Sequence, residues 1–285
     1  MHEQAVALRD AGVDVKIVQP IPYTPFPLPL VNERYRKLSG IPEFEQNEGF
    51  DVYHPRYLAL PRNILFQHVG KWMFQGIRKQ VARIYANWKF DLIHAHTTYP
   101  CGYAANLLRD RMLPEVKVVH TIHRTCIIDA PNYNRACYAR VKKALIDADT
   151  TVFVASEGQT IAHNMTDGVI DARSEYITNG VSISKFTLSL SDKQEVERLK
   201  QQYADSWNLV FVGYLNDRKG IRELLPAVAE LIRAGRSNLR LFLVGRNDLG
   251  NYIPEFIREN QLADNVIEIG SVHHSRIILW MNFAD

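Results

Sequence analysis

Cysteine is scarce in this sequence of 285 residues, which contains only three. Cys101, Cys126 and Cys137 are odd in number, widely spaced and form no CxxC pair. This usage excludes a disulfide framework and a zinc knuckle, because both need paired cysteines at suitable spacing. It is typical of a reducing compartment, so we expect a cytoplasmic protein.

Long apolar runs are also missing. No stretch approaches the roughly 20 consecutive apolar residues that a membrane-spanning helix needs. The first residues lack the charged start, apolar core and small-residue cleavage site of a signal peptide. We therefore expect a protein that is soluble or peripheral on the inner face of the plasma membrane.

Neither charge sign dominates the whole chain, since the formal net charge is only +3. This mild excess gives no reason to expect a nucleic-acid partner. Locally, however, residues 62–89 contain no Asp or Glu, and six Lys or Arg side chains alternate there with apolar and aromatic residues. Such a segment predicts either a basic amphipathic helix on an anionic membrane or a covering helix with a basic solvent face.

Seven short apolar runs rich in Val and Ile alternate with helical patterns. Most are continuous, which indicates parallel strands covered by helices on both faces, the doubly wound α/β plan. Since the chain exceeds one typical core of roughly 100 to 200 residues, we expect two Rossmann-like domains. The runs begin at Val13, Phe90, Val116, Thr150, Asn208, Leu239 and Val266.

The segment "YITNGVSISKF" from Tyr176 precedes a polar helical stretch, after which strands and helices alternate again. It predicts a first domain at 1–175 and a second at 176–285. Residues 1–10 read as a helix without a preceding strand, and the last helical pattern has no strand after it. We therefore expect both domains to have lost strands at the ends of this chain. The run "PIPYTPFPLPL" from Pro20 predicts an extended loop.

Polar and glycine residues gather where these strands end. In open parallel sheets, ligands bind beyond the carboxyl ends of the strands. The residues at those ends are His94, His96, His120, His123, Ser156, Asn179, Gly180, Gly213 and Gly245.

His94 and His96 are two residues apart on a strand and so share one face. That spacing fits either a metal pair or polar groups that line a substrate cleft. No nearby carboxylate or cysteine completes a ligand set. We therefore favour the cleft lining and expect no metal.

The stretch "NLVFVGYLNDRKGIRELLPAV" runs from a strand through Gly213 and two cations into a helix. Glycine permits close approach of a ligand to the backbone, and a helix start offers free amides and a positive dipole end. With Arg218 and Lys219 alongside, the loop predicts an anion site. It is neither a Walker loop nor a GxGxxG, so a solvated Arg-Lys pair that caps a turn is the alternative.

Eight segments, in order along nearly the whole chain, resemble glycosyltransferase family 4, especially its bacterial exopolysaccharide and teichuronic-acid branch. They are "HEQAVALRDAGVDVKIVQP", "FDLIHAH", "VVHTIH", "ADTTVFVASE", "YITNGVSISKF", "VFVGYLNDRKGIRELLPAV", "VGRNDLG" and "VIEIGSVHHSRIILWMNFAD". The resemblance implies two domains facing a cleft (the GT-B fold) and retaining transfer from a nucleoside diphosphate sugar. It implies a polysaccharide or lipid-linked acceptor, and no cofactor or metal.

The resemblance also implies residue roles. Lys219 matches the lysine that binds the donor diphosphate, and His123 matches the histidine that reaches the donor sugar and leaving phosphate, so these two are the implied catalytic residues. The donor-binding residues are Gly213, Tyr214, Arg218, Lys219, Gly245, Asn179 and Gly180. The acceptor-side residues are His94, His96 and Ser156.

The chain departs from the family pattern in identifiable places. Tyr214 stands where the family usually has arginine, so Arg218 is the expected substitute. Arg124 and its neighbours replace the Gly-Ser-Asp that often follows His123. The glycine-rich loop would precede residue 1 and the Glu-x7-Glu segment would follow Asp285, so we expect an incomplete second domain. Two alternatives remain open: a nucleotide-sugar 2-epimerase of the same fold, and a non-catalytic module that only binds nucleotide.

Overall fold

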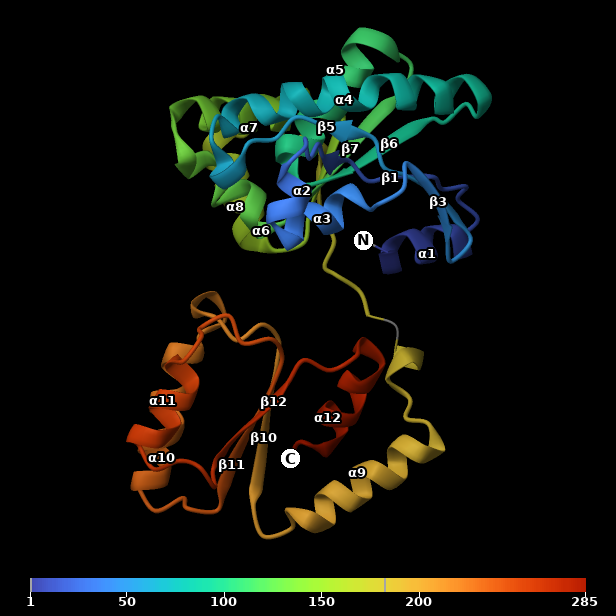
Figure 1. The fold of residues 1–285 in the computed structure, drawn as a ribbon. Helices are drawn as coiled ribbons and strands as arrows, with labels where there is room; N and C mark the ends of the chain where they lie inside the picture. The colour runs from blue at the N-terminus through green and yellow to red at the C-terminus, as the bar shows by residue number, and fades with distance from the viewer. Residues whose placement is uncertain (1, 182) are drawn as a thin grey trace. The chain divides into compact units, whose positions relative to one another are not determined.

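The computed structural model describes residues 2–181 and 183–285 (Figure 1). The chain divides into two compact units, Met1–Gly180 and Val181–Asp285. Each unit has its own parallel sheet and its own buried core. The predicted α/β class with parallel sheets is confirmed.

The main sheet of the first unit has four parallel strands in the order β6-β7-β8-β9. The long runs predicted from sequence form its first three strands. Helices α5, α7 and α8 contribute to the core beneath it. The bounds are β6 Leu92–His96, β7 Lys117–Ile122, β8 Thr150–Phe153, β9 Ser174–Tyr176, α5 Tyr103–Met112, α7 Arg135–Asp147 and α8 Ser156–Thr166.

The N-terminal part of this unit is built from shorter strands. The run from Val13 forms only a two-residue strand, which pairs in the order β1-β4-β3 with β3 antiparallel, while β2 pairs with β5. The expectation of an extended proline-rich loop is wrong beyond Pro27, since α2 begins at Leu28 with Pro29 in its first turn, where no amide is needed. The bounds are α1 His2–Asp10, β1 Ile17–Val18, β2 Ile21–Pro22, α2 Leu28–Val31, α3 Glu33–Ser39, β3 Phe44–Asn47, β4 Phe50–Tyr53 and β5 Arg56–Tyr57.

The basic segment 62–89 forms the long helix α4, Phe66–Asn87. Its apolar side is buried and packs with α5 and β5, so it covers the core of the first unit. Its cations face outward, where Lys71, Arg78, Lys79 and Arg83 are exposed. Within the described ranges 2–181 and 183–285, no helix combines the length and apolarity needed to cross a membrane.

The second unit is a parallel sheet in the order β10-β11-β12, covered on both faces (Figure 1). Leu241 and Leu243 face a core with α10 and α11, while Phe242 between them packs with α9 and α12. This two-sided burial is why the strand sequences are continuously apolar. The bounds are α9 Leu190–Gln202, β10 Trp207–Val212, α10 Ile221–Arg233, β11 Leu239–Val244, α11 Tyr252–Glu259, β12 Val266–Gly270 and α12 Ile277–Phe283.

Candidate functional site

Three histidines meet at the carboxyl end of the sheet in the first unit. His94 and His96 lie at the end of β6, and His123 follows β7 as the residue before helix α6, Arg124–Ile127. The rings of His94 and His96 are 4.8 Å apart with an interplanar angle of 27°. His94 Nε2 lies 2.7 Å from Thr121 Oγ1 on the neighbouring strand. The shared face predicted for His94 and His96 therefore exists, and His123 joins it.

Burial keeps these imidazoles neutral. It is the main cause that lowers the pKa of His96 to about 4, with His94 and His123 adding to the effect. Burial likewise lowers the pKa of His94 and of His123 below the ordinary 6.5. At pH 7 the cluster therefore offers uncharged hydrogen-bonding groups and no cation.

The unfolded chain should bind more protons than the folded chain between pH 4 and 6.5, because burial lowers the folded pKa of His96 and His120 to about 4 from 6.5. Stability is thus expected to be independent of these groups above pH 6.5 and to fall as the pH drops toward 4. Urea unfolding at several pH values in this interval measures how steeply the free energy of unfolding depends on pH. His96→Asn should make this pH dependence shallower. A free energy of unfolding that does not change with pH in the wild type would contradict the assignment.

His120, the fourth histidine at these strand ends, does not join the cluster. Its side chain is fully buried, and neither ring nitrogen has a partner at hydrogen-bonding geometry among the described residues. Burial lowers its pKa to about 4, although the neighbouring backbone of Gly102 opposes part of the shift. A Cβ on Gly102 would lie 2.4 Å from His120 Cε1. His120 is therefore a core residue, and the absence of a side chain on Gly102 leaves room for its ring.

Gly102→Ala is expected to destabilise the first unit by about 1 to 3 kcal/mol, because the new methyl group overlaps a ring enclosed on all sides. Backbone strain adds nothing, since Gly102 already has helical dihedral angles. Gly158→Ala is the matched control: its nearest neighbour is 3.5 Å away and it lies in α8, so a gain of about 0.5 to 1 kcal/mol is expected. Chemical denaturation measures the free energy of unfolding of both variants and so checks both expected changes.

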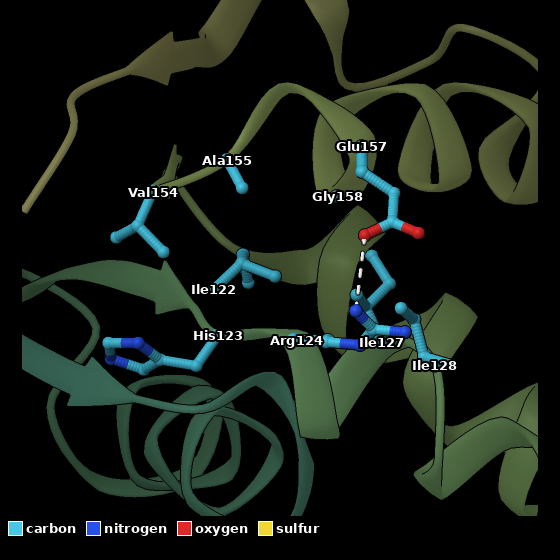
Figure 2. A pocket seen from close by; sticks show the side chains of 9 residues that line it. All are labelled: Ile122, His123, Arg124, Ile127, Ile128, Val154, Ala155, Glu157 and Gly158. Atoms are coloured by element: carbon cyan, nitrogen blue, oxygen red, sulfur yellow. Dashed lines mark ion pairs between the residues drawn. The ribbon is translucent and has the colours of Figure 1, made fainter. Parts of the chain in front are cut away.

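A small hollow lies beside the histidine cluster, between the ends of β7 and β8 and the start of α8 (Figure 2). Its lining includes Ile122, His123 and Ala155, and Arg124 Nη1 reaches Glu157 Oε2 at 3.9 Å. Figure 2 shows the His123 ring pointing away from this ion pair. Ser156, predicted on the acceptor side, is exposed at the first position of α8.

The second unit contains the loop predicted to bind an anion. After β10 the chain passes through Gly213 and an exposed Tyr214, and the side chain of Asn216 then accepts a hydrogen bond of 3.1 Å from the Lys219 amide. This cap sets a single 3-10 turn that ends at Gly220, where α10 begins. Lys219 is therefore held at the start of α10 and is exposed.

Gly213 and Gly245 lie directly against each other at the ends of β10 and β11. The Gly213 amide donates to Val244 O at 2.9 Å, and the Gly245 amide donates to Gly270 O at 2.9 Å. A Cβ on Gly245 would lie 1.7 Å from Gly213 O. A side chain at position 245 would displace the Gly213 carbonyl, so Gly245 is what lets the two strand ends come this close.

Charged groups surround this corner of the second unit. The Arg246 guanidinium lies 4.9 Å from the centre of the Tyr214 ring, and its Nε donates to Asp248 Oδ1 at 2.7 Å. Arg246 is thereby the main cause that lowers the pKa of the Asp248 carboxyl. Arg218, the expected substitute for a missing arginine, is exposed in the same turn as Lys219.

Residues 1–185 match the model described as Glycosyltransferase Family 4. The chain belongs to glycosyltransferase family 4. The resemblance inferred from its eight segments is therefore confirmed.

Two curated relatives also align with this family 4 chain. A glycosyltransferase of Bacillus subtilis (strain 168), TuaC, named for teichuronic acid biosynthesis, is 27% identical over 233 residues, which are 81% of this chain and 57% of TuaC. The uncharacterized glycosyltransferase MJ1607 of Methanocaldococcus jannaschii is 23% identical over 240 residues, 82% of this chain and 59% of that protein. The chain thus spans less than two thirds of the length of either relative.

Solved structures share the fold. The crystal structure of Anabaena Alr3699/HepE with UDP and glucose aligns with a TM-score of 0.61 at 17% identity, over 93% of this chain and 64% of that chain. An E. coli structure described as trehalose-6-phosphate bound with UDP-2-fluoro glucose aligns with a TM-score of 0.64 at 13% identity. The alignment covers 99% of this chain and 72% of that chain. These neighbours are GT-B glycosyltransferases, so the predicted fold class is confirmed.

The candidate site residues of this family 4 chain fall into separate groups. His94, His96 and His123 meet in the first unit, whereas the glycines and cations of the donor loop meet in the second. Asn179 and Gly180 are exposed and end the first unit. The sequence analysis missed Asn216 and Arg246, although each has a signal: an Asn three residues before a turn amide, and a cation directly after Gly245.

Proposed function

We propose that this family 4 chain carries the donor and acceptor parts of an enzyme that moves a sugar from a nucleoside diphosphate sugar, with retention, to a cell-envelope polysaccharide or lipid-linked acceptor. One observation carries the proposal: the turn after β10, capped by Asn216, exposes Arg218 and Lys219 directly before a helix. The carboxylates of Asp217 and Asp248 beside them are each paired with another arginine. Solved structures of similar fold that contain UDP or a UDP-sugar support a donor of this kind.

The chemistry of the leaving group fits this corner. When the sugar leaves, negative charge develops on the diphosphate, and preorganised donors around it lower the barrier. Lys219 supplies a full charge, Arg218 a second one, and the first amides of α10 point out of the helix start. Gly213 and Gly245 keep the backbone bare of side chains, so a phosphate can approach closely. We propose that Tyr214 and Arg246 flank the donor there.

The histidine cluster is the proposed sugar-side group. His123 would contact the donor sugar and the leaving phosphate as a neutral imidazole, which can donate one hydrogen bond and accept another. His94, His96 and Ser156 would bind hydroxyl groups of the acceptor. Asn179 and Gly180 would complete the donor side. The scheme needs no metal ion and no cofactor.

The acceptor class and location are parts of the same proposal. The relative named for teichuronic acid biosynthesis favours an anionic cell-wall polymer or its lipid-linked precursor. We place the enzyme on the cytoplasmic face of the membrane, where the exposed cations of α4 would meet anionic lipids. Because the apolar side of α4 is buried in the protein's own core, this attachment would be electrostatic and weakened by salt.

A donor screen tests the proposal. The protein is incubated with uridine, guanosine and adenosine diphosphate sugars, with and without cell-envelope acceptors, and the products are separated. Transfer of sugar to an acceptor supports the transferase. An epimer formed from the donor alone would identify a 2-epimerase, and nucleotide binding without turnover would identify a binding module.

A further inference from the structure

We propose that His96 is a positioning residue that fixes the protonation and orientation of His123 through a hydrogen bond between the two imidazoles. The inference rests on the proposed function for the contact of His123 with the donor. It goes beyond that function, because it gives His96 a role toward His123 in addition to its proposed contact with the acceptor. The assignment depends on how the two rings meet.

The two rings meet edge to edge in nearly one plane. His96 Nδ1 and His123 Nε2 are 3.4 Å apart, the ring centroids are 5.7 Å apart and the interplanar angle is 18°. The distance between the ring centroids is longer than the distance between the two nitrogens by about twice the radius of an imidazole ring. This is the difference expected when both nitrogens lie on the line that joins the centroids. A face-to-face stack would instead bring the centroids closer than this. The distance is long for a hydrogen bond, as is common for catalytic contacts before substrate binds.

A proton must lie between these nitrogens for the contact to be favourable. Both imidazoles are neutral at pH 7, because burial lowers the pKa of each. If His96 Nδ1 carries the proton, His123 accepts at Nε2 and carries its own proton on Nδ1. If His123 Nε2 carries it, Nδ1 of His123 is an acceptor. In each case the contact with His96 sets whether the other nitrogen of His123 donates or accepts a hydrogen bond toward the substrate.

The surroundings hold His96 in place. Its backbone pairs with Thr121 in the register of β6 and β7, and its ring packs against the His94 ring at 4.8 Å. His94 is in turn held by Thr121 through the 2.7 Å contact to Oγ1. No group of three or more His, Cys, Asp or Glu side chains within the described part of the chain is arranged to hold a metal ion. His96 is therefore held by the strand pairing and by ring packing, and its Nδ1 makes the contact to His123.

Nitrogen chemical shifts of the His123 ring test the inference directly. In the wild type, a single tautomer is expected. His96→Ala should give the mixture of tautomers found in water, whereas His96→Asn should keep one form, because its amide can reach the position of Nδ1. His163→Ala is the control, since His163 pairs with Asp171 on the surface, and it should leave the His123 signals unchanged. Unchanged His123 signals in His96→Ala would overturn the inference.

Kinetics separates this inference from the proposed function. His96→Ala should lower kcat by about 10- to 100-fold, the loss seen when outer partners of a functional imidazole are removed, with the donor KM unchanged. His96→Asn should restore most of the rate. Full activity in His96→Ala would overturn the inference while the transferase stands. A wild type with one His123 tautomer but no transfer would instead refute the proposed function.

Discussion

Lys219→Ala is expected to reduce the rate of sugar transfer by about 10²- to 10³-fold, which corresponds to roughly 3 to 4 kcal/mol of transition-state stabilisation. In the proposed function Lys219 would supply the charge that faces the diphosphate as it leaves, and the turn capped by Asn216 places the Lys219 backbone directly before α10. The effect should appear in kcat with each donor that the screen identifies. Initial rates at saturating donor, together with titration of the nucleoside diphosphate, measure it.

The control for this variant is Lys193→Ala. Lys193 is an exposed lysine on α9 of the same unit, so the change in net charge is identical. It should leave transfer and nucleotide affinity unchanged. Lys219→Arg should keep part of the activity, because the charge remains while its geometry changes. If Lys219→Ala transfers sugar at the wild-type rate, the anion site lies elsewhere.

Gly245→Ala is expected to cost the second unit at least about 3 kcal/mol of folding stability. The new Cβ would lie 1.7 Å from Gly213 O, and that carbonyl belongs to a residue fixed by its own hydrogen bond to Val244. The φ of +154° also lies outside the range that alanine adopts without strain. Because whole domains have only about 5 to 15 kcal/mol of stability, this loss removes a large share of it and should lower the denaturant midpoint of the second unit clearly.

Gly250→Ala separates steric overlap from backbone strain. Gly250 has a φ of +60° and no atom within 4 Å of the added Cβ, so only the strain of the left-handed region, about 1 kcal/mol, should appear. Hydrogen exchange read by mass spectrometry locates the loss within each unit. If the amides of the second unit are equally protected from hydrogen exchange in Gly245→Ala and Gly250→Ala, the close approach of Gly213 and Gly245 is contradicted.

The fold class was readable from the sequence because the strands of the main sheets are buried on both faces. Residues 241–244 around Phe242 are all apolar, since alternate side chains enter different cores. Short strands were less readable: β1 covers only Ile17–Val18 of a longer apolar run. Helix α2 was missed because prolines normally oppose helices, yet Pro29 falls in a first turn where its missing amide costs nothing.

The candidate site was only partly readable. Period-two spacing placed His94 and His96 on one face, and the rings do lie together. The odd spacing of His120 and His123 puts them on opposite faces, but it does not say that His123 shares the face of His94 and His96 while His120 is buried against Gly102. That difference depends on which face of β7 each side chain occupies. Arg246 was overlooked because its contact with Tyr214 crosses between strands that are far apart along the chain.

The sequence alone determined the α/β class, the family and the glycine and lysine positions of the donor loop. These features depend on local chemistry: apolar runs for buried strands, glycine for close backbone approach, and cations directly before a helical pattern. Only the tertiary structure decided that His96 and His123 meet edge to edge and that Gly245 lies against Gly213. Such contacts depend on strand register, because it brings together atoms that no spacing along the chain relates.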